Sequence, residues 1–352
     1  MDEATAEIRF DGKRYGYWQR VEIRESVDDL CSSVTLGIAR PGTGANGGSG
    51  TGMTANTVID VLVDDELVTK VRPDVNRRRV ESTRHTINFL ARSLGRELVD
   101  CQYSKTLSGL KLSEIVKRLC STFKVPVKID VDTPVVPHFS MQCEVPSNAL
   151  INAVRAANLL LYPRPDGGLL LTAPTSAAPV ATLQYGQHFT SYEVVDEYKL
   201  RFSDYVIKTF DYGSDAAIRG AVKDAGILFF RPMHIVADRH SNGQGGCDRR
   251  ATLERNRRLA RAHRIELEVP GWRYQDANGK WRPWAINTQV RVIIPEENIN
   301  DVFLIGERTF RLDDKGGRET LLQVMHRNAF VGEETKKSKR GTGVRGKEAQ
   351  RK

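Results

Sequence analysis

The chain has 352 residues, of which 40% are hydrophobic and 28% are charged, and its formal net charge is +9. This length allows two or three domains with cores of their own, and the composition excludes a largely disordered protein. The sequence contains no run of about 18 apolar residues, so no membrane span is expected. The N-terminal stretch MDEATAEIRF lacks the basic and apolar segments of a signal peptide, so none is expected either.

The first 97 residues predict a small β-barrel or a β-sandwich. Strand-like segments alternate with turn residues at regular spacing, a pattern typical of small barrels and sandwiches. The predicted strands are Ala6 to Phe10, Gly16 to Arg24, Ser33 to Ala39, Thr57 to Val63, Leu67 to Val71 and Arg84 to Ala91.

The glycine-rich stretch PGTGANGGSGTG at residues 41–52 contains the G-x-G-x-x-G spacing of a dinucleotide-binding turn. Such a site needs the glycines to follow a strand and to open a helix, whose N-terminal amides meet the pyrophosphate. Here the β-branched run TVIDVLV follows the glycines, and no Gly-Lys-Ser/Thr sequence is present. The stretch therefore predicts a long, mobile connection between two strands and no cofactor site.

Residues 98–180 predict an α+β module. The segment LKLSEIVKRLCSTF has apolar residues at helical spacing, and SNALINAVRAANLLLYP predicts a second helix, capped by Ser147 and ended by Pro163. The segments VPVKIDV and GGLLLTAP follow these helices as short strands. The first of these helices with its flanks also resembles, over a short length and with low specificity, a LysM carbohydrate-binding module.

Residues 181–330 predict a second β region that contains an inserted basic helix at about 248–264. Strand-like segments such as TSYEVVDEY and QVRVIIP surround the stretch DRRATLERNRRLARAHR, which reads as a helix capped by Asp248. Its seven arginines could contact DNA, but we favour a helix that is packed on one side and solvated on the other. The final residues, 331–352, predict a flexible basic tail, either simply solvated or in contact with nucleic acid or an acidic protein.

The residues that usually carry chemistry form no recognisable motif. The seven histidines fall on separate segments, adjacent acidic residues fall at turns, and no nucleophile elbow is present. No two cysteines form a CxxC pair, so we expect reduced thiols and no metal site; the cysteines are Cys31, Cys101, Cys120, Cys143 and Cys247. The sequence predicts no catalytic, cofactor-binding or metal-binding residues, although a glycosidase could bring distant carboxylates together.

The segment PGWRYQDANGKWRPWAINTQVRVIIP carries the candidate interface residues. Trp272, Tyr274, Trp281 and Trp284 surround an Asn278-Gly279 pair, which predicts a hairpin with a type I′ turn. Tryptophan and tyrosine are enriched at protein-binding hot spots, so these four residues could form a contact surface. We expect at least two of the three tryptophans to be packed in a core or to cap the end of a barrel instead.

The same segment is part of a resemblance to a known family. The ordered set LERNRRLARAHR, VPGW, GKWRPWAINTQVRVIIP and VFLIGERTFRLDDKGGRETLLQV resembles the baseplate hub proteins of contractile-tailed bacteriophages. Upstream, DVLVDDELVTKVRPDV and STRHTINFLARSLGRELVDCQ match the same pattern, in the same order and separated from the first set by the α+β module. Together these segments cover most of residues 20–330, and the family is related to the hub portion of type VI secretion spike proteins.

The resemblance implies a structural protein without enzymatic activity. Each subunit would carry two tube-protein-like barrels, at residues 1–97 and 181–330, and a homotrimer would present six of them as a pseudo-sixfold ring with a channel for DNA. Such a ring joins the sixfold tail tube to the threefold membrane-piercing spike, alongside other baseplate and tape-measure proteins. The expected location is the virion tail baseplate, assembled in the host cytoplasm. A peptidoglycan-binding or cell-wall-degrading tail enzyme and a nucleic-acid-binding protein stay open as alternatives.

Overall fold

The computed structural model describes residues 6–16, 18–41, 54–80, 84–211, 216–236, 243–313 and 317–331. The predicted mobile connection at 41–52 falls outside these residues from position 42 onward, and the predicted basic tail falls outside them from position 332 onward.

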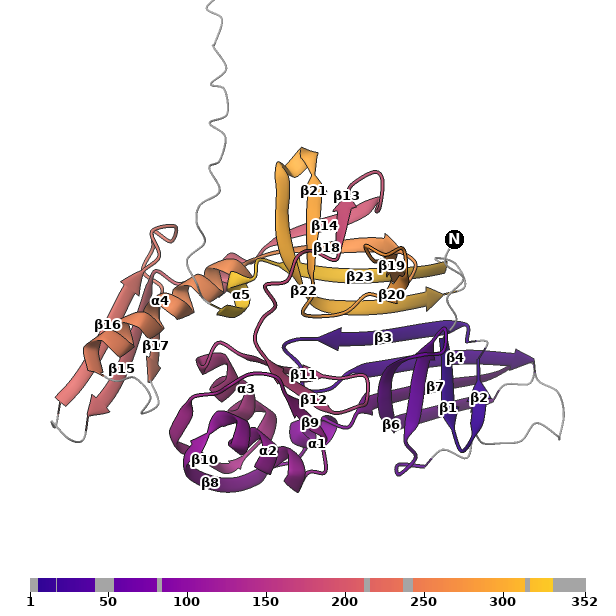
Figure 1. Cartoon of the computed structure of the whole chain (residues 1–352), viewed down its shortest axis with the longest axis horizontal. Helices are drawn as coiled ribbons and strands as arrows, with labels where there is room; N and C mark the ends of the chain where they lie inside the picture. The colour runs from indigo at the N-terminus through magenta and orange to yellow at the C-terminus, as the bar shows by residue number, and fades with distance from the viewer. Residues whose placement is uncertain are drawn as a thin grey trace, which may run out of the picture.

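The molecule is built around one 13-stranded sheet, to which both predicted β regions contribute (Figure 1). The prediction of a mainly β protein with an α+β module is confirmed, but no sheet of the described residues closes into a barrel. The two predicted barrels are instead continuous, because β22 (Ile299–Asp313) of the second region pairs antiparallel with β3 (Arg20–Ser26) of the first. Strand pairing across such a long sequence separation leaves no local pattern that a sequence reading could detect.

The N-terminal part of the sheet is here named the first β unit. It runs in the order β3-β4-β7-β6-β5-β1, with β2 added at the edge of β1. Its strands are β1 (Ala6–Phe10), β2 (Lys13–Tyr15), β3 (Arg20–Ser26), β4 (Ser33–Pro41), β5 (Ile59–Val63), β6 (Glu66–Val80) and β7 (Arg84–Ser93). The short helix α1 (Arg96–Asp100) follows the last strand.

The C-terminal part, the second β unit, has the order β14-β18-β23-β22-β21-β13. Its strands are β13 (Ala181–Gln184), β14 (Ser191–Asp196), β18 (His263–Pro270), β21 (Gln289–Ile294), β22 (Ile299–Asp313) and β23 (Gly317–Met325). The short helix α5 (Asn328–Val331) follows its last strand, as α1 follows β7.

The two β units therefore repeat one strand order, with β3, β4, β5, β6 and β7 corresponding to β14, β18, β21, β22 and β23. Residue registers agree as well: Val34 on β4 pairs with Ile23 and Ala91, and Ile265 on β18 pairs with Val194 and Val324. The long strands β6 and β22 both carry a bulge, at Asp74 and Gly306 respectively. The repeat differs at its edge, since β1 pairs antiparallel with β5 whereas β13 pairs parallel with β21.

One apolar core extends through both β units, with members such as Ile23, Phe89, Leu267 and Phe310. Alternation of buried and half-buried residues along β1 and β23 fits a sheet with one face toward this core. A second, separate core lies in the α+β module.

The α+β module lies between the two β units in sequence. It contains β8 (Tyr103–Lys111), α2 (Leu112–Thr122), β9 (Val127–Ile129), β10 (Val135–Glu144), α3 (Pro146–Ala156), β11 (Leu160–Pro163) and β12 (Leu169–Thr172). Helix α3 ends earlier than predicted, because Asn158 adopts a left-handed φ of 57° just beyond it. The apolar run that follows, including Pro163, is strand β11 and not the last turn of the helix.

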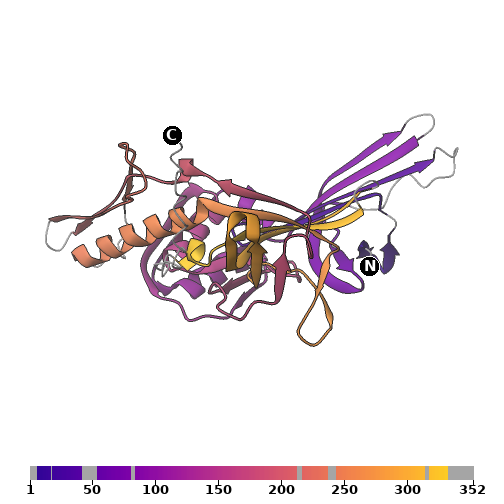
Figure 2. The ribbon, with the colours of Figure 1, turned by 90° about the horizontal axis from the view of Figure 1, so that it is seen from above.

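A further segment, here named the insert, interrupts the second β unit between β14 and β18. It contains the 3-10 turn η1 (Tyr198–Leu200), the three-stranded sheet of β15 (Asp204–Asp211), β16 (Ala216–Lys223) and β17 (Pro232–Val236), and helix α4 (Gly243–Arg261). Helix α4 contains most of the predicted basic helix but begins before Asp248, so that residue is not its cap. Figure 2 shows the insert at one end of the long axis of the molecule.

Candidate protein interfaces

The seam between the two β units, formed by β3 and β22, is held by charged pairs. Arg24 donates two hydrogen bonds of 2.7 Å to the carboxylate of Glu307, and this pair is half exposed. Arg308 lies 2.5 Å from Glu25, and both side chains are almost fully buried. Arg308 also donates to the Trp284 carbonyl, and the Ser32 hydroxyl donates to Glu25.

Burial dominates the electrostatics of the inner pair. It raises the pKa of Glu25 above the ordinary value, although the charge of Arg308 opposes this shift. Burial also lowers the pKa of Arg308, against the opposing effect of Glu25. Each partner therefore depends on the other to remain charged, which ties the register of β3 to that of β22.

Each β unit also packs its final helix against the bulge of its long strand. In the second unit, Phe330 of α5 lies against Gly306. In the first, Arg96 of α1 donates to the Pro73 carbonyl at 2.8 Å and pairs with Asp74 at 2.7 Å. The seam uses the bulge as well, since the Val27 amide donates to the Gly306 carbonyl at 2.9 Å.

Two strand edges that correspond to this seam have no strand partner among the described residues. Beyond Val71, β6 pairs only with β7, whereas the corresponding part of β22 pairs with both β23 and β3. Strand β14 pairs only with β18. We name these the β6 edge (residues 72–80) and the β14 edge (residues 191–196).

The β14 edge is less buried than its counterpart in the seam. Val21 and Ile23 on β3 are fully buried, whereas the corresponding Tyr192 and Val194 on β14 are half-buried. An uncovered edge with apolar side chains is a template for pairing with another chain.

The charges on the two edges are of opposite sign. The β6 edge carries the exposed residues Arg77, Arg78 and Arg79, whereas the β14 edge carries Glu193 and Asp196. Asp196 accepts from His263 at 2.9 Å, in the position where Glu25 accepts from Ser32. Sequence reasoning missed both edges, and their only sequence signal is the run NRRRV at 76–80.

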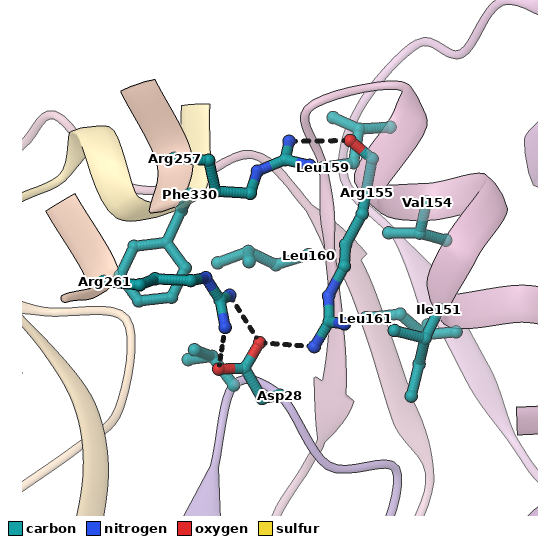
Figure 3. Close-up of a pocket in the computed structure, with 11 residues that line it drawn as sticks. Asp28, Ile151, Val154, Arg155, Leu159, Leu160, Leu161, Arg257, Arg261 and Phe330 are labelled. Atoms are coloured by element: carbon teal, nitrogen blue, oxygen red, sulfur yellow. Dashed lines mark hydrogen bonds and ion pairs between the residues drawn. The ribbon is translucent and has the colours of Figure 1, made fainter. Parts of the chain in front are cut away.

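A cluster of charged residues joins the β3–β4 turn, the α+β module and the insert (Figure 3). Arg261 of α4 and Arg155 of α3 both donate to Asp28, at 2.7 and 2.9 Å. Burial acts to raise the pKa of Asp28, but these two arginines outweigh burial and hold it below the ordinary value. Arg257 donates to the Arg155 carbonyl and to Asn158, and burial lowers its pKa to about 10.

Arg257 and Arg261 of α4 belong to this cluster, and Arg258 of the same helix is paired with Glu254. Three arginines of α4 are therefore bound to other groups of the molecule. They are consequently not displayed to DNA, which favours the packed-helix interpretation of the basic stretch.

The aromatic hairpin is formed by β19 (Arg273–Gln275) and β20 (Trp281–Pro283), as predicted. Trp272 and Trp284 are buried, so two of the three tryptophans belong to the core, also as predicted. Trp281 is 44% exposed, and the half-buried Tyr274 stacks on Trp284 with ring centres 4.7 Å apart. The candidate surface therefore reduces to Trp281 and part of Tyr274.

Two further details place this hairpin. Its turn is not type I′, because of its residues only Gly279 has a positive φ. Arg273 reaches the β5–β6 turn of the first β unit and pairs with Asp64 at 2.9 Å.

Signs of enzyme chemistry are weak among the described residues. They contain no group of three His, Cys, Asp or Glu side chains placed to hold a metal ion. Ser108 and His138 lie 3.3 Å apart, but both are exposed on the two-stranded β8–β10 sheet. A groove of about 430 Å³ beside α2 is lined by Lys105, Lys117 and other residues, and its carboxylate Glu114 is paired with Arg118. No helix in the described ranges is long and apolar enough to span a membrane.

Comparisons with known proteins agree with the resemblance found in the sequence. Residues 96–173 match the second domain of the family of gp44-like baseplate hub proteins, and residues 245–333 match the fourth domain of the Mu phage baseplate assembly protein GpP. The chain is 24% identical to the baseplate hub protein gp44 of Escherichia phage Mu, over 93% of this chain and 89% of that protein.

Solved structures show the same fold. A 43 kDa tail protein of prophage MuSo2 from Shewanella oneidensis superposes with a TM-score of 0.79 at 23% identity, covering 93% of this chain and 99% of that one. An Escherichia coli component of the type VI secretion system superposes with a TM-score of 0.56 at 7% identity, covering 91% of this chain and 76% of that one. The predicted resemblance to phage baseplate hub proteins is thereby confirmed.

Proposed function

We propose that this hub-like chain is the central structural hub of a phage tail baseplate, and that three copies form a ring with pseudo-sixfold symmetry. The ring joins the sixfold tail tube to the threefold spike and leaves a channel for DNA. It works without turnover, in the virion tail baseplate after assembly in the host cytoplasm, among other baseplate and tape-measure proteins. Its function rests on rigid interfaces, not on a catalytic centre.

The observation that carries this proposal is the repeated strand order of the two β units. A chain that contains one unit twice lets a threefold assembly offer six similar surfaces. A sixfold partner can then contact every unit, while features present once per chain recur only three times.

The β6 and β14 edges supply a way to close the ring. In this arrangement, β6 of one copy pairs with β14 of the next copy in the way that β22 pairs with β3 within the chain. Asn76 then lies opposite Asp196, as Arg308 lies opposite Glu25. In the same register, Arg79 faces Glu193, as Arg311 faces Glu22 within the chain. Opposite charges across strands favour this pairing over edge-to-edge contact of two identical edges.

The aromatic hairpin is a feature present once per chain. It occupies the connection between β18 and β21, where the first β unit has the glycine-rich connection between β4 and β5. Exposed Trp281 and Tyr274 would therefore recur three times around the ring, which suits a contact with the threefold spike.

The mass of the protein in solution, measured by light scattering, tests the ring. We expect the wild-type chain to form a trimer, Glu193→Lys and Arg79→Glu each to weaken it at least tenfold, and the double variant to recover it. Glu268→Lys is the matched control, because Glu268 is exposed on β18, which already has a strand on each side. A monomer at high concentration, or a trimer indifferent to both edge variants, would contradict the proposed ring.

A further inference from the structure

Four exposed apolar side chains gather at the base of the insert. Leu228, Phe229 and Phe230 follow one another in the connection between β16 and β17 and are 95%, 64% and 83% exposed. Tyr198 of η1 is 66% exposed. Consecutive large apolar residues open to water are uncommon on a surface that has no partner.

The connection that carries these residues is held in a fixed shape. Arg201 donates two hydrogen bonds, of 2.9 and 2.8 Å, to Asp224, which also accepts from the Gly226 amide. Arg231 closes the other end: its amide donates to Ser203, and its guanidinium donates to the Lys199 carbonyl. The last bond joins the connection to η1, so Tyr198 and Phe230 belong to one preorganised surface, and preorganised surfaces lose little entropy on binding.

The repeat of the two β units indicates what this surface faces. Val194 on β14 corresponds to Ile23 on β3. Tyr198 and Val27 follow these two residues at the same distance along the chain, so Tyr198 is the counterpart of Val27. Val27 is 3% exposed, because it lies in the seam with its amide bonded to the bulge of β22 and close to Phe330 of α5. Tyr198 stands at the corresponding place, but the part of its own chain that the structure describes offers it no such neighbour.

We infer that Tyr198 and the 228–230 connection dock on a second copy of this chain, at the β6 bulge and helix α1. These are the counterparts of the β22 bulge and helix α5. At the β6 bulge and helix α1, Pro73 and Val99 are half-buried, and the side chain of Arg72 is 35% exposed. Aromatic rings pack on such aliphatic groups and accept guanidinium groups on their faces, as Phe202 of the insert does with Arg231 and Arg258.

This inference rests on the proposed ring, but it can fail independently of it. Phe229→Ser with Phe230→Ser is expected to weaken the wild-type trimer at least tenfold in light scattering over a dilution series. Val135→Ser is the matched control, because Val135 is 57% exposed on β10. If the trimer forms and the strand-edge variants weaken it while the double serine variant does not, the docking is wrong and the ring stands. A wild-type monomer overturns both.

A photo-crosslinking amino acid in place of Phe230, in the otherwise wild-type full-length chain, gives a readout that does not depend on the stability of a variant. The expected product is a link between copies, with the cross-linked peptide drawn from residues 72–100. Cross-links within a single chain only, or to a different region of the second copy, would contradict the inference.

Discussion

Glu25 and Arg308 form the most deeply buried ion pair among the described residues, and each side chain is accessible to water by less than a tenth. Arg308→Met leaves the Glu25 carboxylate without its partner, so we expect the free energy of unfolding to fall by about 3–5 kcal/mol. The double variant Glu25→Leu with Arg308→Met removes both charges and should recover most of this loss. Urea unfolding measures the difference; Arg24→Met, which opens the half-exposed pair with Glu307, should cost about 1 kcal/mol or less.

The lowered pKa of Asp28 makes the free energy of unfolding depend on pH, and the direction of this dependence follows from the direction of the shift. Arg261 and Arg155 lower its folded pKa, so its contribution is complete above the unfolded pKa of about 3.9 and is lost as the pH falls through the folded value. Asp28→Asn should therefore be less stable than the wild type by about 2 kcal/mol at pH 7. Thermal unfolding from pH 7 to pH 2.5 should show this gap narrowing only below about pH 4; a gap that widens in acid would contradict the assignment.

The packing of the insert depends on a position where only glycine fits. A Cβ atom on Gly220 of β16 would lie 2.3 Å from the backbone of Cys247 in α4. We expect Gly220→Ala to lift α4 from the sheet, with a cost of about 3 kcal/mol and faster hydrogen exchange in β15–β17. Gly16→Ala is the control, because its Cβ would meet only Glu7, at 3.8 Å. Equal protection of β15–β17 in both variants would show that α4 does not hold this sheet.

Local patterns in the sequence account for the elements more fully than for their assembly. The apolar spacing of α2 and the aromatic hairpin could be predicted, because helical period and turn residues are local signals. The seam could not, since Arg24 and Glu307 are 283 residues apart, and alternation along a strand does not name its partner. One part of the candidate interface could be predicted, because Trp281 was a candidate interface residue and is exposed. The β6 and β14 edges could not be predicted, because they are recognised only by comparing the two β units.

For the whole molecule, the repeat determines which residues would face each other in the proposed contact between copies. In the proposed ring, Asn76 of one copy lies opposite Asp196 of the next, as Arg308 lies opposite Glu25 within the chain. Opposed residues on antiparallel strands have Cβ atoms about 5 Å apart, close enough for a disulfide after small adjustments. Asn76→Cys with Asp196→Cys, in a chain whose exposed Cys143 is replaced by serine, should then link copies upon mild oxidation.

The offset pair, Asn76→Cys with Val195→Cys, separates this register from any loose contact of the two edges. A shift of one residue turns the second thiol to the opposite face of the sheet, so this pair should link far more slowly. Non-reducing gels would show covalent dimers and trimers for the in-register pair, and monomers for the offset pair. Equal linking of both pairs would mean that the edges meet without the register of the β3–β22 seam, and that the pseudo-sixfold arrangement does not follow from the repeat.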